Sequence, residues 1–503
     1  MWLVDLVIMS EVKNGKIGIL KTTFLFGFVQ IARLLISVVK NKAIAMILGP
    51  KGVGTISIYN NALDLIKTGA GLGVSQSAVK DISEANVSKD QLELSRTISV
   101  INEVVLYTSV LGLVVTIIFS PVLSRWSFGD YSHISSYVLF SLAVFFTIYL
   151  ENQLSILKGM RMLKSLAKAT LLGSFLAIIV GLPSIFLWGE KGIVISLVAS
   201  AIATAMYSSY YVSKIRYTKI KLSYKEIKQR ASPMVKMGSS LMMSNFLAFF
   251  SNTVVLGWIQ NNGGLDDVGF FHAGSVLVVS YFSMVTTAMN TDFYPRISEC
   301  ADDDYRLSEE IYQQSSIGLL IIQPLVVGFI LLSTIIIKLL YTAEFDIVKQ
   351  YTDIAIIGVV ASIITNCYGY LIIVKRAAKF YLFSSVLFSV LLVPLYIIFY
   401  KLYNICGLGI AYTLDVVIQL IVYYAFCNKK YNQVIKKDVL IDFCVTIILV
   451  FISVLVREIN SSLLSMGLSI ILLISVLTYA YYKLRNKVGI DALQYLKKKL
   501  EHK

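Results

Sequence analysis

Three cations lie within long apolar stretches of the N-terminal part of the chain, where a charged side chain is costly. Arg33 and Lys40 follow Gln30 in the first of these stretches, and Lys67 lies in the second. A charge near the centre of a membrane-spanning helix costs about 2.5–3.5 kcal/mol on insertion scales, so such a residue normally faces water or a partner. Arg binds phosphate through bidentate, charge-assisted hydrogen bonds, and Lys supplies a point charge. The three cations therefore predict an internal site for a diphosphate.

The polar residues of the first stretch share one side of a helix. They stand at positions 23, 30, 33, 37 and 40, at steps of three, four or seven residues, and such steps keep side chains on one helical face. Most other residues of the stretch are apolar, so we expect one face in lipid and one in water. Arg33 has no acid three or four residues away. Either it faces a cavity that binds an anion, or it pairs with an acid on another helix.

Acids within the apolar stretches are candidates for ion coupling. Asn60, Asp64 and Lys67 lie together in the second stretch, and Asp64 and Lys67 are close enough in the helix to neutralise each other. Lys67 is then structural; the alternative is that it contacts the substrate. Asp415 lies in a later apolar stretch. We regard Asp64 and Asp415 as candidate carriers of a coupling ion. The second half also offers hydroxyls and amides, which suit sugars, at Ser280, Ser283, Thr287 and Asn290.

Composition places these residues in a membrane. The 503-residue chain is 57% hydrophobic and 15% charged, whereas soluble domains are about 25% charged. Apolar stretches of about 20 residues recur, each long enough for a helix to cross about 30 Å of hydrocarbon, and they do not alternate as barrel strands do. The sequence predicts an all-α polytopic membrane protein of about 14 transmembrane helices, at residues 17–39, 53–74, 98–119, 137–157, 167–187, 192–212, 238–260, 268–290, 317–340, 354–374, 380–400, 406–426, 439–455 and 463–482.

The net charge of +15 is explained by topology. Of the 45 Lys and Arg residues, 34 fall on the side that holds both termini and 9 on the other. Cytoplasmic loops carry the excess of Lys and Arg, so both termini are predicted to be cytoplasmic. The basic loop 214–236 is then an anchor beside anionic lipid, and no nucleic acid is expected as a partner. The five cysteines lack metal-ligand or redox spacing, so no metal site is predicted.

The chain repeats itself in two halves. Gly49-x4-Gly54 recurs as Gly264-x4-Gly269 at an offset of 215 residues, and Gly192 matches Gly409 at an offset of 217. Transporters built from parallel repeats place their substrate between the halves. The predicted parts are an N-terminal six-helix lobe at 1–213, a cytoplasmic basic linker at 214–237, a C-terminal six-helix lobe at 238–428, and two extra helices with a basic cytoplasmic tail at 429–503.

Several segments carry a family pattern. They are residues 48–54 (Leu-Gly-Pro-x-Gly-x-Gly), 69–73 (Gly-Ala-Gly-Leu-Gly), 290–297 (Asn-Thr-Asp-Phe-Tyr-Pro-Arg-Ile) and 340–345 (Leu-Tyr-x3-Phe). They resemble the Wzx-type polysaccharide (O-antigen/capsule) flippases of the multidrug/oligosaccharidyl-lipid/polysaccharide exporter superfamily. The resemblance covers roughly residues 15–430. It implies two six-helix lobes in a V shape around a central cationic cavity.

The resemblance also implies a function. Such flippases translocate undecaprenyl-diphosphate-linked oligosaccharide repeat units from the cytoplasmic to the periplasmic leaflet of a bacterial inner membrane, by alternating access. Their cavity charges correspond here to Arg33 and Lys67, and Arg296 belongs to the matched segment. Besides the lipid-linked substrate and membrane lipid, a glycan polymerase and a chain-length regulator are implied as candidate partners. The candidate substrate-binding residues are Gln30, Arg33, Lys40, Asn60, Lys67 and Arg296.

Two other functions stay open. A drug or cation exporter of the same superfamily should have an acidic cavity, whereas the predicted one is basic. A membrane glycan polymerase or glycosyltransferase usually has a large extramembrane loop with catalytic acids, and the longest loop predicted here has about 25 residues. The sequence lacks the P-loop motif G-x4-G-K-[ST]. We therefore expect a transporter and not an enzyme, with no cofactor, and with a proton or sodium gradient as its candidate energy source.

Overall fold

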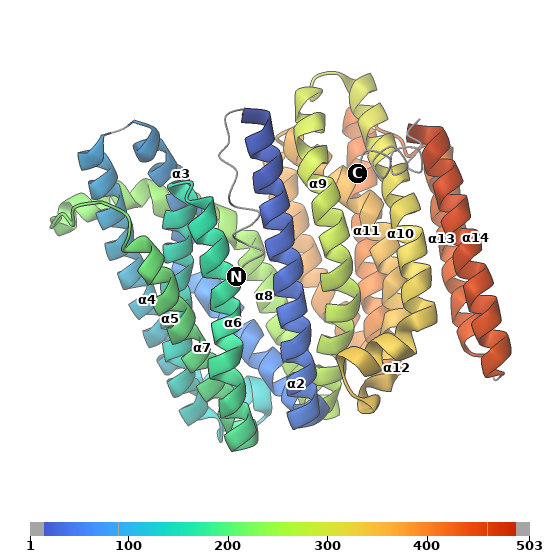
Figure 1. Cartoon of the computed structure of the whole chain (residues 1–503), viewed down its shortest axis with the longest axis horizontal. Coiled ribbons are helices and arrows are strands. Elements are labelled where there is room, and N and C mark those ends of the chain that lie inside the picture. Colours follow the sequence, from blue (N-terminus) through green and yellow to red (C-terminus); the bar gives the residue numbers. More distant parts are fainter. Residues whose placement is uncertain (1–14, 89, 460, 489–503) are drawn as a thin grey trace, which may run out of the picture. The chain divides into compact units, whose positions relative to one another are not determined.

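The computed structural model describes residues 15–88, 90–459 and 461–488, and these residues form helices and no strands (Figure 1). The all-α fold predicted from the sequence is confirmed. The predicted basic tail beyond residue 488 lies outside the described residues. The helices are α2 (Gly15–Gly71), α3 (Val74–Val87), α4 (Gln91–Phe128), α5 (Ile134–Gly159), α6 (Leu163–Trp188), η1 (Gly189–Lys191), α7 (Gly192–Val212), α8 (Tyr224–Ser275), η2 (Val276–Ser280), α9 (Tyr281–Glu299), α10 (Asp304–Leu340), η3 (Ala343–Val348), α11 (Lys349–Val374), α12 (Ala378–Tyr431), α13 (Lys437–Arg457) and α14 (Ser462–Val488).

Many of these helices are long and apolar enough to cross a membrane. Nine such stretches occur among the residues searched, and three of them, Leu163–Val212, Met242–Glu299 and Ala378–Tyr431, are 50 to 58 residues long. A helix rises about 1.5 Å per residue, so each of the three is long enough for two crossings of about 30 Å. Helix α2, which carries the first two predicted spans, has 57 residues. Two crossings in each of these four segments and one in each of the six shorter stretches account for the fourteen predicted spans.

The chain forms two compact units, Met1–Thr253 and Val254–Lys503, which divide within α8. In the first unit α5 packs against α4 and α7, and α6 packs against α7. The ring of Tyr59, on α2, lies 5.1 to 5.5 Å from the rings of Phe128, Tyr137 and Phe140, and this aromatic cluster is part of the core. In the second unit α11 packs against α12, and α10 packs against α13 and α14. The predicted lobe boundaries stay a prediction.

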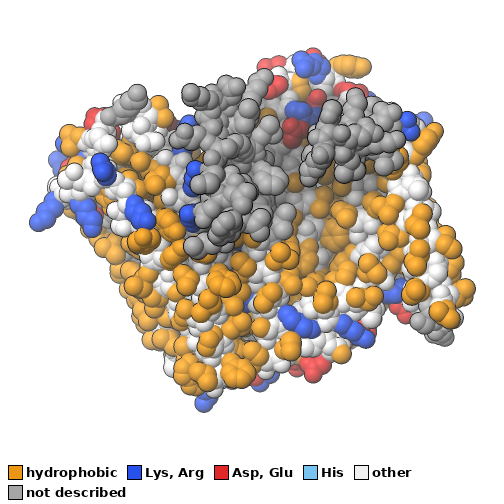
Figure 2. Space-filling view, in the orientation of Figure 1, with side chains coloured by type: hydrophobic (Ala, Val, Ile, Leu, Met, Phe, Trp, Pro, Cys, Tyr) orange, Lys and Arg blue, Asp and Glu red, His pale blue; other side chains and the backbone are white. Residues whose placement is uncertain are grey.

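The outer surface of the helices is apolar. Large exposed hydrophobic side chains include Phe119 on α4, Phe186 on α6 and Leu455 on α13. Figure 2 shows such side chains over most of the drawn face of the first unit, with Lys and Arg gathered at one end in the upper left. Exposed apolar surface on this scale is typical of a protein that sits in lipid. The chain is therefore a multi-pass membrane protein, as predicted.

The backbone repeats at the offset found in the sequence. Helix α2 breaks at Gly49 (φ 64°, ψ −165°), and α8 breaks at Gly264 (φ 87°, ψ 179°), 215 residues later. This conformation is essentially restricted to glycine, because a Cβ atom clashes there. Both glycines lie between predicted spans, so each break re-aims the chain from one span into the next.

Further backbone features recur at the same offset. The positive φ of Arg161 (53°) returns at Arg376 (52°), and that of Gly189 (57°) returns at Asn404 (50°). An added Cβ would lie 2.0 Å from the Ser184 carbonyl oxygen at Gly192 and 1.9 Å from the Phe399 carbonyl oxygen at Gly407. The equivalent of Gly192 is thus Gly407. The predicted match of Gly192 with Gly409 is wrong by two residues, because the sequence could not show which glycine makes this contact.

Helix α13 runs along α10 in the same direction. Polar contacts join them at nearly constant separations of 123 to 126 residues, in the pairs Tyr312–Asp438, Ser316–Asp442, Gln323–Thr446 and Ser333–Arg457. The carboxylate of Asp442 is 1% exposed and also pairs with Lys483 of α14. The Arg457 guanidinium makes two hydrogen bonds of 2.7 and 2.8 Å to Asp353 of α11. The two extra helices are therefore an integral part of the second unit.

Candidate substrate site

The predicted cations of α2 lie on a helix with two uncovered sides. Gln30 and Arg33 are exposed and Lys40 is half-buried. Leu35 and Val39 are 58% and 59% exposed. Leu35 lies two positions from the exposed Arg33, and Val39 lies two positions from the exposed Ser37. Two positions correspond to about 200° around the helix, since a helix turns about 100° per residue. The polar and apolar sides of this part of α2 are therefore both open, as expected for a helix with one wet face and one lipid face.

Neither Arg33 nor Lys40 has an acidic partner in the described part of the chain. The ion pairs found there, within 4.0 Å, involve Lys67 and other cations. The two alternatives raised by the sequence for Arg33 were an anion-binding cavity and an acid on another helix. No such acid is found among the described residues, so the binding of an anion stays the favoured prediction.

Lys67 is held by two carboxylates. Its ammonium lies 2.8 Å from Asp64 Oδ1 within α2 and 3.1 Å from Glu151 Oε1 on α5. The cluster carries one net negative charge when all three groups are ionised. The structure thus favours the structural alternative for Lys67, which ties α2 to α5. The sequence indicated the pair with Asp64 but not the contact with Glu151.

Asn60 is half-buried on α2, and its neighbour Asn61 makes the better-defined contacts. The Asn61 amide donates to Thr253 Oγ1 at 2.5 Å, and Asn252 donates to Asn61 Oδ1 at 2.6 Å. These bonds join α2 to the first part of α8. The two neighbouring amides therefore differ in role: Asn61 fixes the helices, and Asn60 stays a candidate for substrate contact.

The contact between α2 and the first part of α8 continues at the break between α2 and α3. Leu72 and Gly73 have positive φ angles, of 49° and 62°. An added Cβ at Gly73 would lie 2.2 Å from the carbonyl oxygen of Gly238 on α8. Ser77 donates to the Met234 carbonyl oxygen at 3.0 Å. Within the first unit, α2 and α3 thus run antiparallel to the first part of α8, with backbone packed on backbone at the two glycines.

The guanidinium of Arg296 is hydrogen-bonded to other residues of the second unit. Its Nε donates to Asp292 at 2.8 Å, one Nη pairs with Glu310, and the other donates to Gln314 Oε1 at 3.1 Å. All three edges of the guanidinium are used, so the prediction that Arg296 binds substrate gains no support from its position. We interpret Arg296 as a clamp between α9 and α10.

Asp415 is a buried carboxylate in α12. It is 7% exposed, and Gln419 donates to its Oδ2 at 2.8 Å. No residue in the described ranges hydrogen-bonds its Oδ1. A buried carboxylate without full compensation is costly unless it takes up a proton or a cation. Asp64 is already paired with Lys67, so Asp415 is the stronger of the two candidates for ion coupling.

A cavity of about 420 Å³ lies in the first unit beside α3, α4 and the start of α8. Asp81, Glu84 and Glu93 line it, and Arg230 makes two hydrogen bonds of 2.6 and 3.3 Å to Glu93. Burial, with the nearby Glu84 carboxylate, raises the pKa of Asp81, and Lys80 opposes the shift. The excess of carboxylates makes this cavity unsuitable for a diphosphate.

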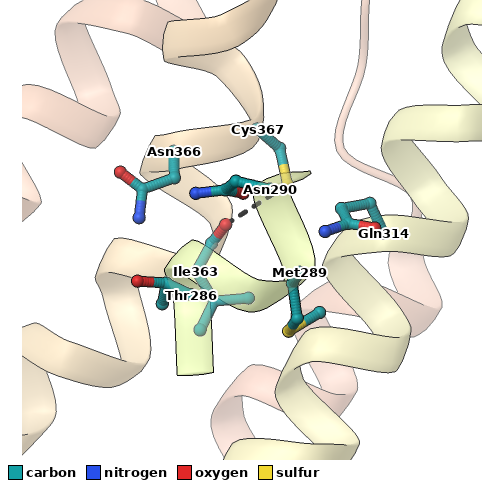
Figure 3. Close-up of a pocket in the computed structure, with 7 residues that line it drawn as sticks. All are labelled: Thr286, Met289, Asn290, Gln314, Ile363, Asn366 and Cys367. Atoms are coloured by element: carbon teal, nitrogen blue, oxygen red, sulfur yellow. Dashed lines mark hydrogen bonds between the residues drawn. The ribbon is translucent and has the colours of Figure 1, made fainter. Parts of the chain in front are cut away.

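A small polar cavity lies in the second unit, among α9, α10 and α11 (Figure 3). The amides of Asn290, Gln314 and Asn366 and the hydroxyl of Thr286 line it, together with three less polar residues. Asn290 belongs to the polar stripe noted in the sequence. Gln314 and Asn366 were missed, because the sequence does not show that they meet Asn290 from neighbouring helices.

The family follows from a comparison with known proteins. Residues 43–350, more than half of the chain, match the model of the family described as polysaccharide biosynthesis protein. The chain belongs to this family. This polysaccharide biosynthesis protein is also 21% identical over 354 residues to the lipid III flippases of Escherichia coli K12 and Shigella flexneri, covering 69% of this chain and 82% of each relative.

Solved structures share the fold of this polysaccharide biosynthesis protein. The lipid II flippase MurJ, in an inward closed conformation, has a TM-score of 0.65 and 15% identity, covering 93% of this chain and 99% of that chain. An inward-facing multidrug resistance MATE transporter has a TM-score of 0.57 and 16% identity, covering 80% and 94%. A MOP superfamily transporter from Pyrococcus furiosus has a TM-score of 0.54 and 14% identity, covering 82% and 96%. The chain therefore has the fold that these flippase and transporter structures share.

Proposed function

We propose that this protein is a flippase that moves a polyprenyl-diphosphate-linked saccharide across the cytoplasmic membrane by alternating access. The observation that carries the proposal is the pair Arg33 and Lys40, two cations seven residues apart on α2 without an acidic partner among the described residues. The curated relatives are named as lipid III flippases, and a similar structure is that of a lipid II flippase. Both names agree with a lipid-linked substrate.

The chemistry of the two cations suits a diphosphate. Arg33 can donate two parallel hydrogen bonds to one phosphate, and Lys40 supplies a second positive charge two helical turns further on. In the proposed cycle the head group enters from the cytoplasmic leaflet while the polyprenyl tail stays in lipid. The side of α2 that carries Leu35 and Val39 faces hydrocarbon, so one helix serves both environments.

The finer assignment follows the resemblance found in the sequence. The proposed substrates are undecaprenyl-diphosphate-linked repeat units of O-antigen, capsule or a related glycan, and both termini are proposed to be cytoplasmic. Gln30 and Asn60 are proposed to contact the head group beside Arg33. Asp415 is proposed to carry the coupling ion, because its Oδ1 has no partner among the described residues. A glycan polymerase and a chain-length regulator remain proposed partners.

A transport assay with the full chain tests the proposal. Proteoliposomes are loaded with a polyprenyl-diphosphate-linked oligosaccharide that carries a terminal galactose, and an impermeant galactose oxidase reports how much is exposed outside. We expect the wild-type protein to expose the inner pool, whereas protein-free liposomes should not. A parallel assay follows efflux of the cationic dye rhodamine 6G. Dye efflux without glycan exposure would contradict the proposal and favour a drug exporter.

A further inference from the structure

The small cavity of the second unit is lined by amides with unused hydrogen-bonding capacity. Asn290 and Asn366 are half-buried, and neither side chain has a hydrogen-bond partner among the described residues. Gln314 is 6% exposed, and its Oε1 accepts from Arg296. Its NH₂ group therefore turns toward the cavity, as Figure 3 shows. Polar groups inside a membrane protein are costly unless they meet a polar partner.

The rest of the lining is already satisfied or apolar. The Thr286 hydroxyl donates to the Ser283 carbonyl oxygen at 2.9 Å, so it keeps only acceptor capacity. The Cys367 thiol donates to the Ile363 carbonyl oxygen at 3.3 Å, the dashed line in Figure 3. Met289 and Ile363 supply apolar walls. A group bound in the cavity must therefore form hydrogen bonds with the three amides.

Charge excludes two kinds of partner. Among the residues that the structure describes, no charged side chain lines the cavity. The nearest cation in the hydrogen-bond network, Arg296, is engaged by Asp292, Glu310 and Gln314. A phosphate would find no free cation, and a metal cation would find no carboxylate and would face the NH₂ group of Gln314. A neutral group that both donates and accepts fits the set, and a hydroxyl does both.

The volume of the cavity further limits the group that can bind there. The free volume is about 10 Å³, close to the space of one water molecule. A whole sugar ring does not fit, but one hydroxyl group does. The half-buried position of Thr286, Asn290 and Asn366 lets such a group reach in from outside the unit.

We propose that Asn290, Gln314 and Asn366 form a hydroxyl notch that recognises one hydroxyl of the saccharide carried by the flippase. This inference rests on the proposed function and adds a separate place for sugar recognition, away from the cations of α2. A site built to hydrogen-bond a hydroxyl discriminates strongly against a ligand that lacks it, because its polar groups are then left unpaired. The notch is thus a determinant of which glycan is accepted.

The test separates diphosphate binding from sugar binding. Purified full-length protein is titrated with farnesyl diphosphate and with farnesyl diphosphate linked to glucose, galactose or N-acetylglucosamine. For each sugar, the dissociation constant of farnesyl diphosphate divided by that of the glycosylated ligand measures the gain in affinity from the sugar. We expect Asn366→Leu and Asn290→Leu each to lower this ratio roughly three- to tenfold, the range of one hydrogen bond. Binding of farnesyl diphosphate itself should change less than about twofold.

A matched control is available on α10. Gln313 is an exposed amide next to Gln314 and does not line the cavity, so Gln313→Leu should leave the ratio unchanged. Both test variants replace an amide by an apolar group in a helix, which favours membrane insertion, and thermal unfolding of each verifies that it is folded. An unchanged ratio in both variants, or a wild-type protein that gains nothing from any sugar, overturns the notch while leaving the flippase intact. Failure to bind farnesyl diphosphate at all refutes the proposed function and this inference with it.

Discussion

Replacing Arg33 should abolish transport without destabilising the protein. Arg33 is exposed on α2, within a predicted span, and no carboxylate of the described residues pairs with it. In Arg33→Ala the guanidinium is lost but no ion pair is broken. A guanidinium at such a position costs about 2.5–3.5 kcal/mol on insertion scales. The variant should therefore insert at least as well as the wild type.

The expected loss of binding follows from the bonds that a guanidinium makes. A hydrogen bond to a charged group contributes about 1.5–3 kcal/mol, so two of them contribute about 3–6 kcal/mol. At about 1.4 kcal/mol per tenfold change, the affinity for a diphosphate should fall by about 10² to 10⁴ in Arg33→Ala. Arg33→Lys keeps the charge but loses the bidentate geometry, so about half of that free energy should remain.

The assay is complementation of a flippase-null bacterium, read as surface glycan, with the amount of membrane protein measured by immunoblot. Gln313→Leu serves as a control that changes an exposed polar residue elsewhere. Wild-type glycan levels in Arg33→Ala would refute the argument that this cation holds the substrate. Loss of the protein itself would instead show that Arg33 has a structural partner.

Three further predictions concern other charged groups. Asp353→Asn should lower the free energy of unfolding by about 1.5–3 kcal/mol, because the 9% exposed Arg457 guanidinium loses the carboxylate that accepts two of its hydrogen bonds and keeps only Glu458 as an acidic partner among the described residues. Glu458→Gln, at a 67% exposed partner, should cost less than about 1 kcal/mol. Equal midpoints of the two variants in a thermal melt would contradict this. Asp415→Asn should keep binding of farnesyl diphosphate but make transport insensitive to a proton or sodium gradient, and transport that still follows the gradient would exclude Asp415 as the carrier. The pKa of Asp81 is raised in the folded state, so the contribution of Asp81 to stability is present at acid pH and is lost as the pH rises through the folded-state pKa. Asp81→Asn should therefore be more stable than the wild type at pH 7 and equally stable near pH 3. Thermal melts in which the two proteins differ by the same amount at both pH values would disprove the shift of the pKa.

Much of the fold could be predicted from the sequence, because it depends on local properties. All predicted spans but one lie within helical segments of the structure, and the span 192–212 has the same bounds as α7. The exception is the span 53–74, which crosses the break at Leu72 and Gly73. Apolar stretches of this length form helices in lipid since only intrahelical bonds satisfy the backbone there. The repeat was visible for the same reason: Gly49 and Gly264 mark the same backbone break, and only glycine suits it. The pair Asp64–Lys67 was also local, three residues apart on one helix.

Contacts between helices were decided by the tertiary structure alone. Helical periodicity shows which residues share a face, but not which face of another helix stands opposite. Glu151 therefore could not be assigned to Lys67, nor Glu310 and Gln314 to Arg296. The same limit applies to the candidate site. The sequence identified Arg33 as a cation in a span, but only the packing of the helices shows that it has no acidic partner among the described residues. Packing also brings three amides from three helices together at one small cavity.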